Sequence, residues 1–76
     1  MNKSDRKSIN EWYDQIEKIK SAMEDMRELE DEKLNNMPES LQESERGQQM
    51  QEGIDSLDYA IDNLQDCLDN ISELRD

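Results

Sequence analysis

The fold is decided by residues 50–71, MQEGIDSLDYAIDNLQDCLDNI, in which apolar side chains recur at alternating intervals of four and three residues. The members of this repeat are Met50, Ile54, Leu57, Ile61, Leu64, Leu68 and Ile71, and Leu74 closes it. A repeat that averages about 3.5 residues places these side chains along one side of an α-helix and is typical of helices that pack against other helices. The segment contains no proline. It therefore predicts a long helix, at about residues 47–75, with one apolar seam.

The first half of the chain carries a second apolar repeat with the same spacing. Its members are Ile9, Trp12, Ile16, Ile19, Met23 and Met26. Glu30 and Lys33 occupy the next two positions, as expected of a straight helix, whose turn of about 3.6 residues slips against a seven-residue repeat. Ser4 or Ser8 is expected to cap the start, and Pro38 lies just beyond the end. This half therefore predicts a first long helix, at about residues 5–35.

A polar connection at about residues 36–46 separates the two predicted helices. Ser40 or Ser44 is expected to start the second helix, after a short turn around Pro38. A connection this short leaves two long helices little alternative to lying antiparallel. The predicted fold is therefore all-α: a single domain, residues 1–76, built as an antiparallel, coiled-coil-like hairpin of two helices.

The core between two helices is small, and domains of this size usually need a disulfide, a structural metal or oligomerisation. Cys67 is the only cysteine and the chain has no histidine, which excludes an internal disulfide and the common zinc sites. Gly53, Ala60 and Cys67 recur every seven residues beside the second seam, where small side chains let a further helix approach closely. We therefore predict a homodimer in which two hairpins form a four-helix bundle. Its interface would contain these three residues and Trp12, which is either a dimer anchor or the plug of the open end of the hairpin.

Acidic residues dominate the charge of the chain, with 21 Asp and Glu against 9 Lys and Arg and a net charge of −12. Nucleic-acid backbones and anionic membrane surfaces repel such a protein. The expected partner is a protein with a basic surface, for which a nucleic-acid-binding protein is one candidate, and no direct contact with nucleic acid or membrane is expected. The first residues lead into no apolar run, so neither a signal peptide nor a membrane span is expected. Together with the lone thiol, this predicts a cytoplasmic protein.

Carboxylates recur every three or four residues along one side of the second predicted helix. They are Asp55, Asp58, Asp62, Asp66, Asp69, Glu73 and Asp76. Like charges at this spacing destabilise a helix by about 0.2–0.5 kcal/mol per pair, and Asp is a poorer helix former than Glu. Two interpretations stay open. The column imitates a phosphate backbone and occupies a basic groove, with its first six members as the partner-binding residues, or it is a solvated face that keeps the protein soluble.

Sequence motifs for catalysis or metal binding are missing. Asp58 and Asp62, four residues apart, could hold a divalent cation loosely, but calcium and magnesium sites need several converging oxygens, usually in a glycine-containing loop. Paired carboxylates act as general acid and general base only in a pocket that separates their pKa values. The sequence has no glycine-rich phosphate loop, and Cys67 is interpreted as a small apolar filler. We therefore expect no catalytic residues, no metal site, no cofactor and no enzymatic activity.

Two stretches resemble a known group of proteins: residues 34–47, LNNMPESLQESERG, and residues 54–61, IDSLDYAI. Together they are similar to small uncharacterised acidic helical-hairpin proteins of Firmicutes prophages and mobile elements. The likeness covers residues 34 to about 72 and leaves the first predicted helix unmatched. It implies a mobile genetic element in a bacterial host cell, where small acidic proteins often inhibit host defence or DNA-binding enzymes. No catalytic or binding residues carry over from it.

These observations lead to two functional hypotheses. The first is a non-enzymatic acidic protein-binding module, in its sharper form a phage or mobile-element inhibitor that blocks a host nucleic-acid-binding or defence protein by nucleic-acid mimicry. The alternative is a structural or scaffolding helical-bundle protein that binds through apolar helix faces. The salt dependence of binding distinguishes the two hypotheses, because added salt screens exposed charges and weakens binding through the acidic residues.

Overall fold

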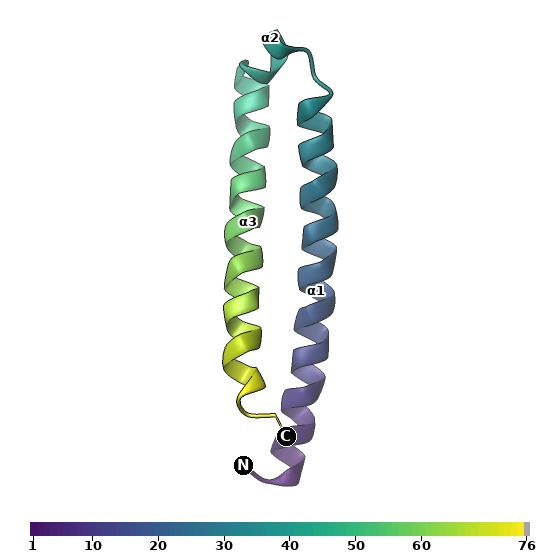
Figure 1. Cartoon of the computed structure of the whole chain (residues 1–76), viewed down its shortest axis with the longest axis vertical. Helices are drawn as coiled ribbons and strands as arrows, with labels where there is room; N and C mark the ends of the chain where they lie inside the picture. The colour runs from purple at the N-terminus through teal and green to yellow at the C-terminus, as the bar shows by residue number, and fades with distance from the viewer. Residues whose placement is uncertain (76) are drawn as a thin grey trace.

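A computed structural model describes residues 1–75 of the chain. These residues form two long helices, α1 (Lys3–Asn35) and α3 (Glu45–Ser72), and a single helical turn between them, α2 (Glu39–Gln42). The predicted all-α class is confirmed. Asp76, the last of the predicted acidic column, lies outside the described residues. α1 and α3 run side by side in opposite directions, with α2 at the turn, and the molecule is a rod of 58 × 14 × 12 Å (Figure 1).

The first long helix begins two residues before the predicted start because a different residue caps it. The side chain of Asn2 accepts a hydrogen bond from the backbone N–H of Asp5, at 2.8 Å, and so satisfies one of the free donors at the start of a helix. Ser4 and Ser8, the predicted caps, lie inside α1. The helix ends where predicted, and Pro38 follows, which has no N–H to continue it.

The connection is more structured than the predicted loop. Ser44 caps α3: its hydroxyl donates to the carbonyl of Leu41 and accepts from the N–H of Gly47. This cap starts α3 at Glu45, two residues earlier than predicted, and the helix ends at Ser72 rather than near residue 75. Gly47 packs directly on the end of α2, where an added β-carbon would lie 2.1 Å from the carbonyl oxygen of Gln42. Only glycine fits this position, since it has no side chain.

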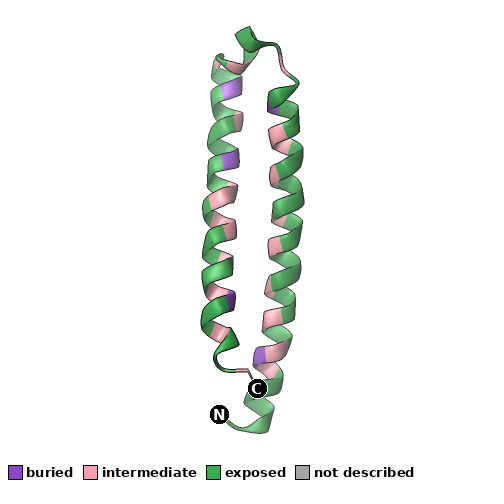
Figure 2. Ribbon diagram, viewed as in Figure 1, coloured by how far each residue is buried: buried purple, intermediate pink, exposed green. Residues whose placement is uncertain are grey.

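The core lies along the contact between α1 and α3. Its buried members are Ile9, Leu34, Ile54 and Leu68. Figure 2 shows the buried positions on the sides of the two helices that face one another. On α3, every member of the predicted repeat from Met50 to Ile71 is buried or half-buried.

On α1, half of the predicted repeat faces away from α3. Ile9, Ile16 and Met23 face inward, but Trp12, Ile19 and Met26 are exposed. The inward positions between them hold Tyr13, Lys20 and Arg27 instead. The long apolar stems of Lys and Arg can pack in such a contact while their charged ends reach water. The single seam predicted for this helix is therefore wrong at every second position, where the next residue along the chain faces α3 instead.

Two hydrogen bonds between side chains fix the register of the long helices. Arg27 donates to Asp58, and Arg75 donates to Asn10. Position 10 of α1 thus pairs with position 75, just beyond α3, and position 27 of α1 pairs with position 58 of α3. Positions 10 and 27 are 17 residues apart, and so are positions 58 and 75. The two helices stay in step over this whole length. None of the helices in residues 1–75 is both long and apolar enough to cross a membrane.

Candidate interaction faces

Each long helix turns one row of residues toward the other. On α1 the inner row is Ile9, Tyr13, Ile16, Lys20, Met23, Arg27, Glu30 and Leu34. On α3 it is Met50, Ile54, Leu57, Ile61, Leu64, Leu68 and Ile71, and Arg75 continues this row just beyond the end of the helix. All of these residues are buried or half-buried. Successive residues of a helix are turned by about 100° around its axis. The residues just before the inner row therefore line one flank of each helix, and the residues just after it line the other.

The preceding flanks carry no charge over most of their length. We call them together the uncharged face, which consists of Trp12, Gln15, Ile19, Ala22, Met26 and Leu29 on α1 and Gly53, Ser56, Ala60, Asn63, Cys67 and Asn70 on α3. The inner row of α3 points in the direction opposite to that of α1, and α3 also runs antiparallel to α1. Each of these differences alone would move the preceding flank to the other side, and together they cancel. Both preceding flanks therefore lie on the same side of the helix pair.

The following flanks are acidic. We call them together the acidic face, whose carboxylates are Asp14, Glu17, Glu24, Glu28 and Asp31 on α1 and Asp55, Asp58, Asp62 and Asp69 on α3. The other positions of these two rows are Asn, Ser or Gln, so neither row contains a base. The two broad sides of the rod thus differ sharply in charge.

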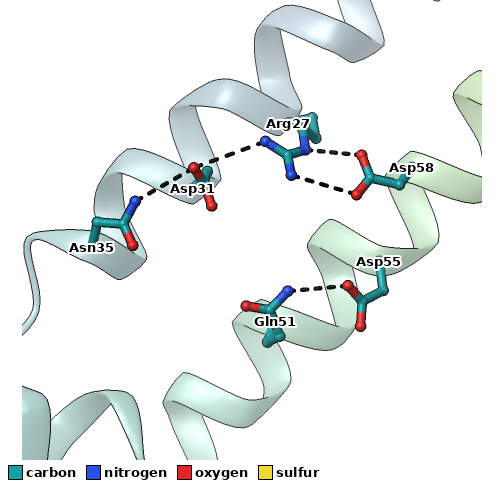
Figure 3. Close-up of polar contacts among 6 residues, drawn as sticks. All are labelled: Arg27, Asp31, Asn35, Gln51, Asp55 and Asp58. Atoms are coloured by element: carbon teal, nitrogen blue, oxygen red, sulfur yellow. Dashed lines mark hydrogen bonds and ion pairs between the residues drawn. The ribbon is translucent and has the colours of Figure 1, made fainter.

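Arg27 ties the two acidic rows together. Its Nε lies 2.8 Å from Oδ1 of Asp58 on α3, and its Nη1 lies 3.8 Å from Oδ2 of Asp31 on α1 (Figure 3). Because one guanidinium meets a carboxylate from each helix, the two rows share a side of the molecule. The hydrogen bond from Arg27 to Asp58 also raises the pKa of the guanidinium above its ordinary value.

Other basic side chains of the inner rows also point toward the acidic face. Lys20 pairs with Glu24 at 3.4 Å, and Arg75 donates to Asn10, which precedes the acidic residues in their row. Arg75 also lies over the ring of Tyr13, 4.0 Å from its centre. The bases of the inner rows therefore face the carboxylates, which leaves the uncharged face without charged neighbours from the helix contact.

The predicted partner-binding column does not form one separate stripe. Asp55, Asp62 and Asp69 are exposed on the acidic face, while Asp66 and Glu73 are exposed on the outer side of α3. Asp58 is half-exposed and engaged by Arg27. Asp55 and Asp69 accept hydrogen bonds from Gln51 and Gln65 four residues earlier. The first of these two bonds appears in Figure 3. The sequence-based prediction considered only the carboxylates of the second helix, so it missed those of α1 that extend this surface.

The predicted dimer residues all lie on the uncharged face, with Trp12 and Gly53 toward opposite ends of the rod. Trp12 and Gly53 are exposed, and Ala60 and Cys67 are half-buried. An added β-carbon at Gly53 would meet nothing within 4 Å. The exposed large residues of α1 on the same face are Trp12 at 55%, Ile19 at 51%, Met26 at 58% and Leu29 at 57%. The sequence-based prediction placed Ile19 and Met26 in the contact between the helices. The one signal against it is that each directly precedes a charged residue of the inner row, Lys20 or Arg27.

Among residues 1–75 no three His, Cys, Asp or Glu side chains converge as a metal site would require. No family model, curated protein or solved structure matches the chain. The resemblance to prophage proteins therefore stays a prediction.

Proposed function

We propose that this chain is a non-enzymatic protein-binding module that binds helices through its uncharged face. The observation that carries the proposal is the row of exposed apolar side chains on α1, Trp12, Ile19, Met26 and Leu29. Contiguous exposed apolar surface bordered by polar residues marks interaction sites in soluble proteins. This is the helical-bundle alternative raised by the sequence.

The spacing of the exposed residues suits a helix as the partner. Anchors at intervals of three, four and seven residues are those that an amphipathic helix offers to a groove or to another helix. Complete burial of a large apolar side chain contributes about 1.5–3 kcal/mol, and these four residues keep more than half of their surface in water. A second copy of the chain is one partner that fits, and it would form the homodimeric four-helix bundle predicted from the sequence.

A photo-crosslinking pair tests the proposal. Ala22 lies on the uncharged face and its neighbour Ser21 lies on the acidic face, and both are exposed. Each is replaced in turn by benzoylphenylalanine, and the protein is irradiated in the cells that produce it. The proposal predicts adducts of defined mass from position 22 and few from position 21. Equal labelling at both positions, or none at position 22, would contradict it.

A second candidate function uses the acidic face, which would bind a basic protein surface. Six of its nine carboxylates make no ion pair within residues 1–75, namely Asp14, Glu17, Glu28, Asp55, Asp62 and Asp69. In its sharper form this candidate is a phage or mobile-element inhibitor that acts by nucleic-acid mimicry on a host nucleic-acid-binding or defence protein in the bacterial cytoplasm. Its support is the charge pattern and the resemblance of residues 34 to about 72.

Charge reversal tests this second candidate. Asp55, Asp62 and Asp69 are changed together to Lys, and captured host proteins are compared at low and high salt. A basic partner should be lost from the variant and should leave the unchanged protein at high salt, because exposed charges are screened beyond about 8 Å at physiological ionic strength. A matched variant, Gln15→Lys with Asn63→Lys and Asn70→Lys, adds bases to the uncharged face and should retain the basic partner. Equal capture by all three proteins would sink the mimicry candidate.

A further inference from the structure

We infer that the uncharged face is covered by a second copy of this chain, placed face to face so that α1 of each copy packs along α3 of the other. This inference rests on the proposed helix-binding function and names the helix that is bound. It is supported by the angle between two rows of α1, the sizes of the facing residues, the charges of the helices and the exposed area.

The angle fits the corner of a four-helix bundle. On α1 the uncharged row precedes the inner row by one residue, which is a rotation of about 100°. A helix at the corner of a square bundle contacts two neighbours at nearly this angle. The repeat from Ile9 to Met26 takes its residues alternately from the inner and uncharged rows, so its average direction lies between the two contacts. That direction is the centre of a four-helix bundle.

Two large residues on α1 match two small residues on α3. The large ones are Ile19 and Met26, and the small ones are Ala60 and Cys67, with each pair spaced by seven residues. Trp12 and Gly53 extend these two rows toward opposite ends of the rod and do not face one another. The register of the two helices puts Ile19 within one residue of the level of Cys67, and Met26 within one residue of the level of Ala60. A twofold axis parallel to the helices preserves these levels. Ile19 and Met26 of one copy then face Cys67 and Ala60 of the second copy, where small side chains allow helix axes about 8–10 Å apart.

Charge favours this orientation over the one in which like helices meet. α1 has seven bases and ten acids, net −3, whereas α3 has one base and seven acids, net −6. Packing α1 on α3 keeps the two α3 helices diagonal and turns both acidic faces outward. It also brings Lys18, at the edge of the uncharged face, to the level of Asp66 of the second copy. Neither residue forms an ion pair within residues 1–75 of its own chain.

The exposed area has the right size for one such contact. The chain exposes 5871 Å², against about 4,900 Å² for a compact monomer of 9.0 kDa. The excess of about 1,000 Å² is comparable to the roughly 800 Å² that each partner loses in a standard protein interface. Covering one broad side of the rod would remove an area of this order.

Analytical ultracentrifugation of the purified full chain tests the self-pairing. We expect a species of twice the 9.0 kDa chain mass. The double variant Ile19→Glu/Met26→Glu should weaken dimerisation by about 100-fold, since it puts charges into the buried centre of an interface. The control Ser21→Glu/Gln65→Glu adds the same charge to the acidic face and should change the dissociation constant by less than about threefold. All four positions are exposed, so each variant should keep its helices. Circular dichroism checks this.

A distance measurement tests the orientation. A spin label is attached at Gln49→Cys, an exposed position at the end of α3 nearest the connection, in a Cys67→Ser background. With α1 packed on α3, the two labels lie at the same level, about 20 Å apart. With like helices packed together, they lie at opposite ends of the bundle, more than about 30 Å apart at 1.5 Å per residue. The longer distance would overturn the inferred packing.

The crosslinking and ultracentrifugation results together distinguish a failure of the self-pairing from a failure of the helix-binding function. A monomeric purified chain whose position 22 still forms adducts in cells overturns the self-pairing and leaves the helix-binding function standing. A monomeric chain without adducts overturns both.

Discussion

Arg27 on α1 and Asp58 on α3 form an ion pair between the two long helices, with Nε 2.8 Å from Oδ1 and Nη2 3.5 Å from Oδ2. The same guanidinium reaches Asp31 on its own helix. This contact lies on the acidic face, so Arg27 both joins the two helices and offsets repulsion among the carboxylates there. The charge pattern and the register of the fold are therefore linked through one side chain.

Replacing Arg27 by Gln should lower the melting temperature more at low salt than at high salt, because salt screens the carboxylates that Arg27 now offsets. Lys33→Gln is the matched control, since within residues 1–75 Lys33 pairs only with Glu30 of its own helix, and its effect should be smaller. The pKa of Arg27 is raised, so its contribution is complete below the ordinary pKa and is lost only as the pH rises through the raised value. The melting difference should therefore be equal at about pH 7 and about pH 9. Circular dichroism melts measure it, and a difference that ignores salt would contradict the role given to Arg27.

The two glycines should respond oppositely to substitution by alanine. Gly47→Ala must displace the end of α2, because its β-carbon would lie 2.1 Å from the carbonyl oxygen of Gln42. Within one copy, Gly53→Ala meets nothing within 4 Å and gains about 1 kcal/mol from the higher helix propensity of alanine. Chemical denaturation should show Gly47→Ala less stable and Gly53→Ala more stable than the unchanged chain. A stable Gly47→Ala variant would mean that the packing of α2 on α3 does not matter.

Truncation of Ile54 should be costly, because its side chain is only 1% exposed. Ile54→Ala is expected to reduce the free energy of unfolding by about 2–5 kcal/mol. Tyr59 on the same helix is 73% exposed, so Tyr59→Ala should change it by less than about 0.5 kcal/mol. Urea denaturation followed by circular dichroism gives both values. Similar losses for the two variants would show that the core does not lie where α1 and α3 meet.

Salt should strengthen self-association. Each chain carries a net charge of −12, so two copies repel one another, and added salt screens this repulsion. The dimer dissociation constant should therefore fall as the salt concentration rises, whereas binding of a basic protein to the acidic face should weaken. Sedimentation equilibrium across a salt series measures the first effect. A dimer that salt dissociates would indicate that charged pairs, and not the apolar residues of the uncharged face, hold the copies together.

The sequence predicts α3 well because all of its Met, Ile and Leu residues serve one contact. The repeat from Met50 to Ile71 faces α1 throughout, and no charged residue interrupts it. α1 is harder, because its apolar residues serve two directions and the contact with α3 also uses Lys20 and Arg27. A pattern of apolar residues alone cannot separate two contacts on one helix. The pairing of charged residues across the helices, which decides the rotation of α1, depends on tertiary structure.

The smaller differences have local causes. Asn2 caps α1 in place of Ser4 or Ser8, although all three are acceptable cap residues and only the position of the helix start selects among them. α2 is a single turn, too short to leave a periodic pattern. The need for glycine at position 47 follows from the close approach of α2 to α3, which no local sequence pattern encodes.

The fluorescence of Trp12 tests most directly whether the uncharged face is covered. Trp12 is the only tryptophan of the chain, and its side chain is 55% exposed in a single copy. At high protein concentration we expect blue-shifted emission with poor access to acrylamide, which moves to red-shifted, readily quenched emission on dilution. Ile19→Glu/Met26→Glu should show the red-shifted emission at all concentrations. Red-shifted, readily quenched emission from the unchanged chain at every concentration would contradict the claim that a second copy covers this face.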